Sequence, residues 1–224
     1  MMIERTPRPC RTAIRGIGRL RHDNSGVALT EFAFALPILL AMSLTGAELT
    51  NYITTKMRMS QVALHLADNA ARIGTGSQLV AKTITESDIN DLFVGANLQA
   101  GELNLQANGR VILTSLEPTA SPNTAGTYKI GWRRCYGAKT SYARKYPSTT
   151  QTTGLSGLGP TGRQVTAPDN GATMFVEIYY EYRPIVRTSL APDTSMTEVA
   201  SMIVRDKRDT TQVYAVAGVT ASTC

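Results

Sequence analysis

The chain has few of the residues from which catalytic and metal sites are usually built. Its 224 residues include only two histidines, His22 and His65, and 18% of them are charged, against about 25% in an average soluble protein. No zinc-protease H-E-x-x-H, Walker-type phosphate loop or G-x-S-x-G serine motif occurs. We therefore expect no enzyme, no catalytic residue, no metal and no cofactor.

Cysteine is also scarce. Cys10, Cys135 and Cys224 are the three cysteines, and none of them forms a C-x-x-C pair. This spacing argues against a structural zinc site and against a thioredoxin-type redox motif.

Basic charge is concentrated at the start of the chain. The formal net charge is +6, and residues 1–26 contribute +4 of it through six arginines, Glu4 and Asp23. The remaining chain is close to neutral. A short basic segment before an apolar one is a membrane-topology signal, so we expect no nucleic-acid partner.

A long apolar run follows, VALTEFAFALPILLAMSLTGAEL at 27–49, with sixteen uncharged residues between Glu31 and Glu48. A helix of this length measures about 34 Å at 1.5 Å per residue, enough to cross a bilayer core. The sequence therefore predicts a transmembrane helix at 27–49 after a leader at 1–26. Glu48 is predicted to lie at the far membrane interface.

The helical pattern continues through 50–76, where Gly74 and Gly76 should end it. A polar stripe lies between two apolar stripes. The polar stripe is Arg58, Gln61, His65, Asp68 and Arg72; the first apolar stripe is Met59, Val62, Leu66, Ala70 and Ile73; the second is Ile53, Met57, Ser60, Leu64, Ala67 and Ala71. Either this extension is covered by its own domain on one side and a neighbour on the other, or it lies wholly inside its own core.

The rest of the chain, 77–224, reads as a β-rich domain. A short helix is predicted at 85–93, and strands are predicted at 110–116, 127–136, 173–183 and 199–208. The third strand alternates Phe175, Glu177, Tyr179 and Glu181 with apolar residues, which predicts a half-buried strand. A long loop, 137–172, lies between the second and third strands.

One feature of the apolar run is physically unusual: Glu31 lies inside it, five residues after Gly26. A carboxylate near the centre of a membrane is penalised by about 2.5–3.5 kcal/mol, and by less near the ends. If the chain were cut after Gly26, the new amino group of Val27 would lie about one helical turn from Glu31. Pairing of these charges, within one chain or between neighbours, would neutralise both and set the axial stagger of adjacent subunits.

These residues carry a family resemblance. Gly26 followed by Glu31-Phe32 resembles the processing site of type IV prepilins of the tight-adherence (Flp) class, and GVALTEFAFALPILL…GAEL is similar to the TadE/TadF-type pseudopilins of that system. The body, with GWRRC, VTAPDNGATMFVEIYYEY, IVRDKRD and a terminal cysteine, resembles pilus assembly proteins of alphaproteobacteria. Major Flp pilins are short and have tyrosine after the glutamate, whereas Phe32 and a product of 198 residues point to a minor component.

The resemblance implies a pilin-like α+β fold, in which a long N-terminal helix packs on a small antiparallel sheet. It also implies a prepilin peptidase that cuts between Gly26 and Val27, with Glu31 as the assembly carboxylate. Glu48 matches a further feature of the family. The implied partners are the inner membrane, the peptidase, other pilins or pseudopilins and the pilus assembly machinery.

The leader arginines predict a cytoplasmic N-terminus and an exported, periplasmic C-terminal domain in a single-pass protein. Export would place Cys135 and Cys224 in an oxidising compartment, so we expect them to form a disulfide. Cys10 would remain in the reduced leader.

Other interpretations stay open. Glu31 is also compatible with an ordinary membrane anchor that is never cut, which would make the protein an envelope binding or adhesion module. A Sec-type signal peptide fits less well, because about thirty residues precede the apolar core and no A-x-A site follows it.

Overall fold

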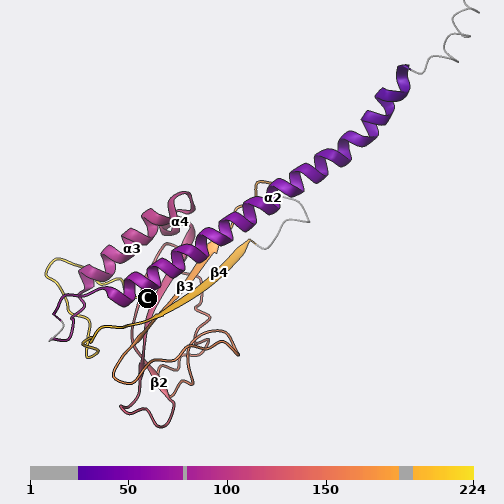
Figure 1. The fold of residues 1–224 in the computed structure, drawn as a ribbon. Helices are drawn as coiled ribbons and strands as arrows, with labels where there is room; N and C mark the ends of the chain where they lie inside the picture. Colours follow the sequence, from indigo (N-terminus) through magenta and orange to yellow (C-terminus); the bar gives the residue numbers. More distant parts are fainter. Residues whose placement is uncertain (1–24, 78–79, 187–193) are drawn as a thin grey trace, which may run out of the picture. The chain divides into compact units, whose positions relative to one another are not determined.

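The structure is a computed structural model that describes residues 25–77, 80–186 and 194–224. It divides into two compact units, Met1–Ala47 and Glu48–Cys224. Helix α2, Ser25–Arg72, contributes to both (Figure 1). The described part of the first unit is residues 25–47.

The second unit contains the end of α2, three further helical elements and four strands. The helices are α3 (Glu86–Ala100), the 3-10 turn η1 (Gly101–Leu103) and α4 (Leu105–Asn108); the strands are β1 (Gly109–Pro118), β2 (Tyr128–Tyr136), β3 (Thr173–Glu181) and β4 (Ser195–Ile203). Helix α3 begins at a reciprocal capping box, in which Thr85 and Asp88 each bond the backbone N–H of the other.

The strands form one antiparallel sheet in the order β2-β1-β3-β4. Strand β1 is central and pairs with both β2 and β3, and a bulge interrupts its register with β2 between Ser115 and Leu116. The expected α+β architecture, a long N-terminal helix packed on a small antiparallel sheet, is therefore confirmed.

Two hydrophobic clusters lie on opposite faces of the sheet. The larger one includes Met59 and Leu66 of α2 and Phe93 of α3, so it lies between the sheet and these helices. The smaller one lies on the other face, where Leu155 and Leu158 of the long loop pack on Leu116 and Phe175. The loop at 137–172 therefore serves as a cover for the sheet.

This cover explains one wrong prediction. Strand β3 was expected to be half-buried, but both of its faces are covered, and Glu177 is only 1% exposed. A period-2 pattern with a charged residue normally indicates a wet face. Here Glu177 instead accepts hydrogen bonds from the Tyr142 hydroxyl (2.6 Å) and the Lys145 backbone N–H (2.8 Å) of the covering loop.

Two element boundaries also differ from expectation. Strand β4 occupies 195–203, not 199–208, because the chain leaves the sheet after Val204 and turns towards α2. Helix α3 continues to Ala100, beyond the predicted end at 93, because Ala96 and Ala100 are buried in the core. Tertiary packing outweighed local signals in both cases.

Helix α2 ends where glycine was expected to end it. Gly74 adopts a φ of +113°, and a Cβ there would lie 2.7 Å from the Thr83 carbonyl oxygen. Only glycine adopts this backbone conformation without strain. The tight turn allows Thr75 to pair with Thr83 directly after the helix.

Candidate functional site

The first unit is an apolar helix that is exposed along its described length. Every residue from Gly26 to Ala47 is exposed, and the segment has a mean hydropathy of 2.0 over its most apolar window. The hydroxyls of Thr30 and Thr45 donate to carbonyl oxygens within the helix, at Val27 (2.8 Å) and Ala41 (2.7 Å). With these two hydroxyls satisfied internally, this helix is long and apolar enough to span a membrane.

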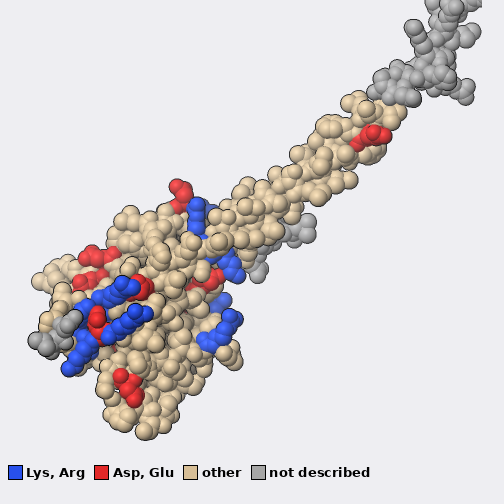
Figure 2. Space-filling model, in the orientation of Figure 1, with Lys and Arg blue, Asp and Glu red and all other residues tan. Residues whose placement is uncertain are grey.

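The three residues predicted to act in processing and assembly all lie in this exposed segment. Gly26 has open space where a side chain would begin, and Val27 and Glu31 project from the same helix one turn apart. Among the described residues, none forms a hydrogen bond or ion pair with the Glu31 carboxylate. Figure 2 shows the segment almost without charged atoms, in contrast to the charged surface of the second unit.

Glu48, by contrast, is buried in the second unit at 5% exposure. Its Oε1 accepts a hydrogen bond from the Tyr182 hydroxyl (2.6 Å), and its Oε2 accepts from the backbone N–H groups of Ile185 (2.8 Å) and Val186 (3.1 Å). Asn51 donates to the Tyr182 oxygen at 2.8 Å. Glu48 thus fastens the chain after β3 to α2, a contact that its sequence position did not reveal.

The Tyr182 hydroxyl should make stability sensitive to alkali. Burial, together with the hydrogen bond to Glu48, raises its pKa to about 12. An unfolded tyrosine ionises near pH 10, so this contribution is complete below pH 10 and is lost as the pH rises towards about 12. We expect Tyr182→Phe to reduce the fall in the free energy of unfolding over this interval, measured by urea denaturation. If the free energy of unfolding falls equally with pH in the two proteins, Tyr182 is not the cause of the alkali sensitivity.

The expected disulfide between Cys135 and Cys224 is present. It joins β2 to the C-terminal segment, whose Ser222 carbonyl oxygen accepts a hydrogen bond from the Cys135 N–H at 2.8 Å. The same segment bonds α3, because Asn90 Nδ2 donates to the Thr220 carbonyl oxygen at 2.9 Å and the Ser222 hydroxyl donates to Asn90 Oδ1 at 2.6 Å. The tail is therefore a strap across the helix layer.

The two apolar stripes of α2 have different environments. All of the first stripe up to Ala70 is buried against the sheet and α3, whereas Ile53, Met57 and Leu64 of the second stripe remain 47%, 58% and 50% exposed. Ala67 and Ala71 of the second stripe are buried. Of the two readings left open, the structure favours a helix covered by its own domain on one side only.

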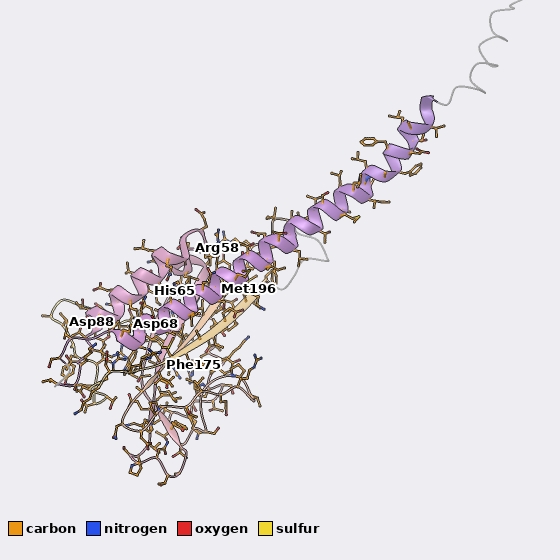
Figure 3. All side chains as sticks on the ribbon, in the orientation of Figure 1. Arg58, His65, Asp68, Asp88, Phe175 and Met196 are labelled. Carbon is orange, nitrogen blue, oxygen red and sulfur yellow. A yellow bond between two sulfur atoms is a disulfide. The ribbon has the colours of Figure 1, made fainter. Side chains whose placement is uncertain are left out.

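The polar stripe reaches a groove of about 840 Å³ between α2 and α3 at Arg72, and Asn69, Asp88 and Asp91 also line this groove. Arg58, His65 and Asp68 follow one another along α2, and Asp88 lies on α3 (Figure 3). Arg72 pairs with Asp68 at 2.9 Å. Within the described ranges, no three or more His, Cys, Asp or Glu residues come together as a metal-binding group.

Two contacts made by a partly buried and a buried arginine were not predicted. Arg134 of β2 pairs with Glu86 at the start of α3, and Arg208 donates to the carbonyl oxygens of Ala70 (3.1 Å) and Ile73 (2.7 Å). Arg208 therefore caps the C-terminal end of α2, where carbonyl groups lack helical partners. Burial lowers its pKa to about 10. The mixed charges at 205–209 look like a solvated turn in the sequence and give no signal of this role.

Comparison with known proteins adds no further assignment. No protein-family model matches the chain, and neither a curated protein nor a solved structure matches it.

Proposed function

We propose that this protein is a minor pilin or pseudopilin of the TadE/TadF type, which takes part in assembly of a tight-adherence (Flp-type) pilus. The observation that carries the proposal is the exposed apolar helix from Gly26 to Ala47 with a single carboxylate, Glu31. The proposal is supported by the motif around Gly26 and by the α+β domain that follows, which would be pilin-like in this role.

The proposed mechanism begins with storage in the inner membrane. A prepilin peptidase on the cytoplasmic side cuts after Gly26, removes the arginine-rich leader and creates a charged amino group at Val27. Glu31 then pairs with this amino group, in its own chain or in a neighbour. Two charges that are costly in an apolar layer become one neutral pair, so packing of adjacent subunits is stabilised at one defined stagger.

The proposed topology follows from the leader charge and agrees with the disulfide. Arginines before the span favour a cytoplasmic N-terminus and a periplasmic domain. Disulfides persist in the periplasm and are rare in the cytoplasm. The bond between Cys135 and Cys224 therefore supports, but does not require, this orientation.

The exposed second stripe supplies a surface for subunit contact outside the membrane. Ile53, Met57 and Leu64 project from α2 at helical spacing and remain about half exposed in the single chain. In an assembled pilus a neighbouring subunit would cover them, as the apolar helix before them would be covered.

N-terminal sequencing of the protein from pilus-forming cells tests the processing step. We expect a mature chain that begins at Val27, and we expect Gly26→Leu to leave the leader attached. Recovery of the unaltered protein with residues 1–26 intact would overturn the proposal. That result would favour the uncut, membrane-anchored binding or adhesion module.

Replacement of Glu31 tests the assembly step. We expect Glu31→Ala to reduce pilus formation and adherence about tenfold or more, because the Val27 amino group loses the partner that offsets its burial. Glu31→Gln, which removes the charge but retains the shape, should have the same effect. The matched control is Glu102→Ala, since Glu102 is an exposed glutamate of the second unit. Unchanged pili with normal membrane levels of the Glu31 variants would contradict this role.

A further inference from the structure

The two edge strands of the sheet, β2 and β4, differ in whether other described segments bond to their outward backbone groups. The β2 edge is covered: the N–H groups of Tyr128 and Ile130 donate to Leu155 and Thr152 of the long loop, both at 2.7 Å, and Cys135 donates to Ser222. Backbone groups of this edge are thus bonded near both ends of the strand. Edge strands left open are sites of pairing with other chains, and coverage of this kind prevents it.

Among the described residues, none covers the β4 edge in this way. The Tyr182 N–H donates to the Thr194 carbonyl oxygen at 2.6 Å, and the Val204 N–H donates to the Ala172 carbonyl oxygen at 2.9 Å. Hydrogen-bonded pairs alternate along an antiparallel ladder, so the even-numbered residues of β4 direct their backbone N–H and C=O groups towards β3. The odd-numbered residues therefore direct their N–H and C=O groups outwards. These are Ser195, Thr197, Val199, Ser201 and Ile203, and no other described residue bonds to their outward groups.

Strand β4 also lacks the features that normally prevent edge pairing. It has nine residues, SMTEVASMI, with no lysine, arginine or proline, and its register with β3 is uninterrupted. Its only charge, Glu198, lies 3.8 Å from Lys56 of α2. A long, nearly uncharged edge without a bulge is the type that accepts a further strand.

Both hydrophobic clusters end at this edge. Ala200 and Met202 are partly buried against the larger cluster, and Val199 is partly buried against the smaller one on the opposite face. An added strand with apolar side chains would extend both clusters at once. A strand rich in charged residues would leave the apolar side chains at the ends of both clusters exposed to water.

We propose that the β4 edge is a docking site for an extended, uncharged and apolar-rich segment of another polypeptide chain, which binds as a fifth strand. The outward groups recur at every second residue, about 6.8 Å apart, and only another β-strand matches that row with both donors and acceptors. The open edge does not depend on leader cleavage or on Glu31.

A different chain fits better than a second copy. The start of β4 lies near Glu48, because Tyr182 bonds both Glu48 and Thr194. The chain after β4 lies near Ala70, because Arg208 donates to the Ala70 carbonyl oxygen. It therefore runs in the same direction as α2. Antiparallel pairing of two β4 strands would set the 48–72 segments of the two copies antiparallel and place the two Glu48 residues at opposite ends of the pair. The apolar segment of each chain joins at Glu48, so this arrangement conflicts with two copies anchored in one membrane. This choice of occupant rests on the membrane anchor of the proposed function.

Amide hydrogen exchange of the full chain in detergent micelles, resolved by residue, tests the proposal. The probe is a capped seven-residue peptide of alternating valine and threonine, and its control has proline at two central positions. We expect the probe to slow exchange at Thr197, Val199 and Ser201 about tenfold or more, because their amides gain partners. Glu198 and Ala200 already bond β3 and should not change. The control peptide should have no effect.

Two variants distinguish docking from general stabilisation. Val199→Pro removes an outward N–H and leaves the bonds to β3 in place, and Ser201→Lys adds a charge to the edge. Both should abolish the protection, whereas Thr210→Lys, at an exposed threonine outside the sheet, should retain it. Fast exchange at the three amides under all conditions would overturn the proposal. Slow exchange at the three amides without peptide would also overturn it. If that protection does not depend on protein concentration, the same chain covers the edge; if it rises with protein concentration, a second copy does.

Discussion

Replacing Cys135 and Cys224 by serine should lower the free energy of unfolding by about 4.5 kcal/mol, the largest single effect that we expect. The reason is the sequence separation of 89 residues between the two cysteines. In the chain-entropy model, a crosslink that closes so long a loop strongly restricts the unfolded ensemble. For a domain of this size the melting temperature should fall by roughly 10–15 °C.

Trp132 provides the measurement, because it is the only tryptophan and packs partly against the larger cluster. Its fluorescence during urea denaturation, with the full chain in detergent, should report unfolding of the second unit. Reduction of the unaltered protein should reproduce the double variant, while Cys10→Ser should have no effect. Equal stability of oxidised and reduced protein would contradict a structural role for the disulfide.

Replacement of Glu48 by alanine should lower the free energy of unfolding by about 2–3 kcal/mol. The carboxylate is buried and accepts three hydrogen bonds, from Tyr182, Ile185 and Val186. Without it, the buried Tyr182 hydroxyl would lose its acceptor, which costs about 1–3 kcal/mol. The N–H groups of Ile185, which is 66% exposed, and of Val186 would bond to water instead, at a smaller cost. The same fluorescence measurement reports the loss.

Matched variants separate this explanation from a general effect of removing a glutamate. Glu48→Gln retains the shape and one acceptor oxygen, so we expect about half of the loss. Glu102→Ala, at an exposed position, should change stability by no more than about 0.5 kcal/mol. A loss of under 1 kcal/mol for Glu48→Ala would show that water replaces the carboxylate and that Glu48 does not fasten the chain.

The two acidic residues that border the apolar run therefore differ in environment. Glu31 projects from an uncovered helix, whereas Glu48 belongs to the interior of the folded domain. Their variants should separate accordingly: Glu48→Ala affects folding of the second unit, and Glu31→Ala affects assembly at normal stability.

Local patterns were sufficient for most of the secondary structure. The apolar run, the capping residue Thr85 and the glycine after α2 act over a few residues, so the sequence predicted α2 and α3, although not η1 and α4. It placed all four strands within about five residues. The disulfide was predictable for a different reason. Only two cysteines follow the span, and the charge of the leader indicates an oxidising compartment for both.

Long-range contacts were not predictable in the same way. Nothing near Glu177 signals that a loop about thirty residues earlier covers it, and nothing near Arg208 signals that it caps α2. Glu48 and Tyr182 are likewise brought together by the path of the chain after β3. A buried charge of this kind is specified by its partners, and those partners are distant in the sequence.

The order of the strands was decided by the same kind of contact. Spacing and composition predict that strands exist, but the covered β2 edge and the open β4 edge follow only from where the loop and the C-terminal strap dock. Hydrophobic periodicity and charge act between residues that are close together in the chain, so the helices and strands that they favour can be predicted from the sequence. Burial, pairing and exposure depend on which distant segments meet, and that is settled by the packing of the whole domain.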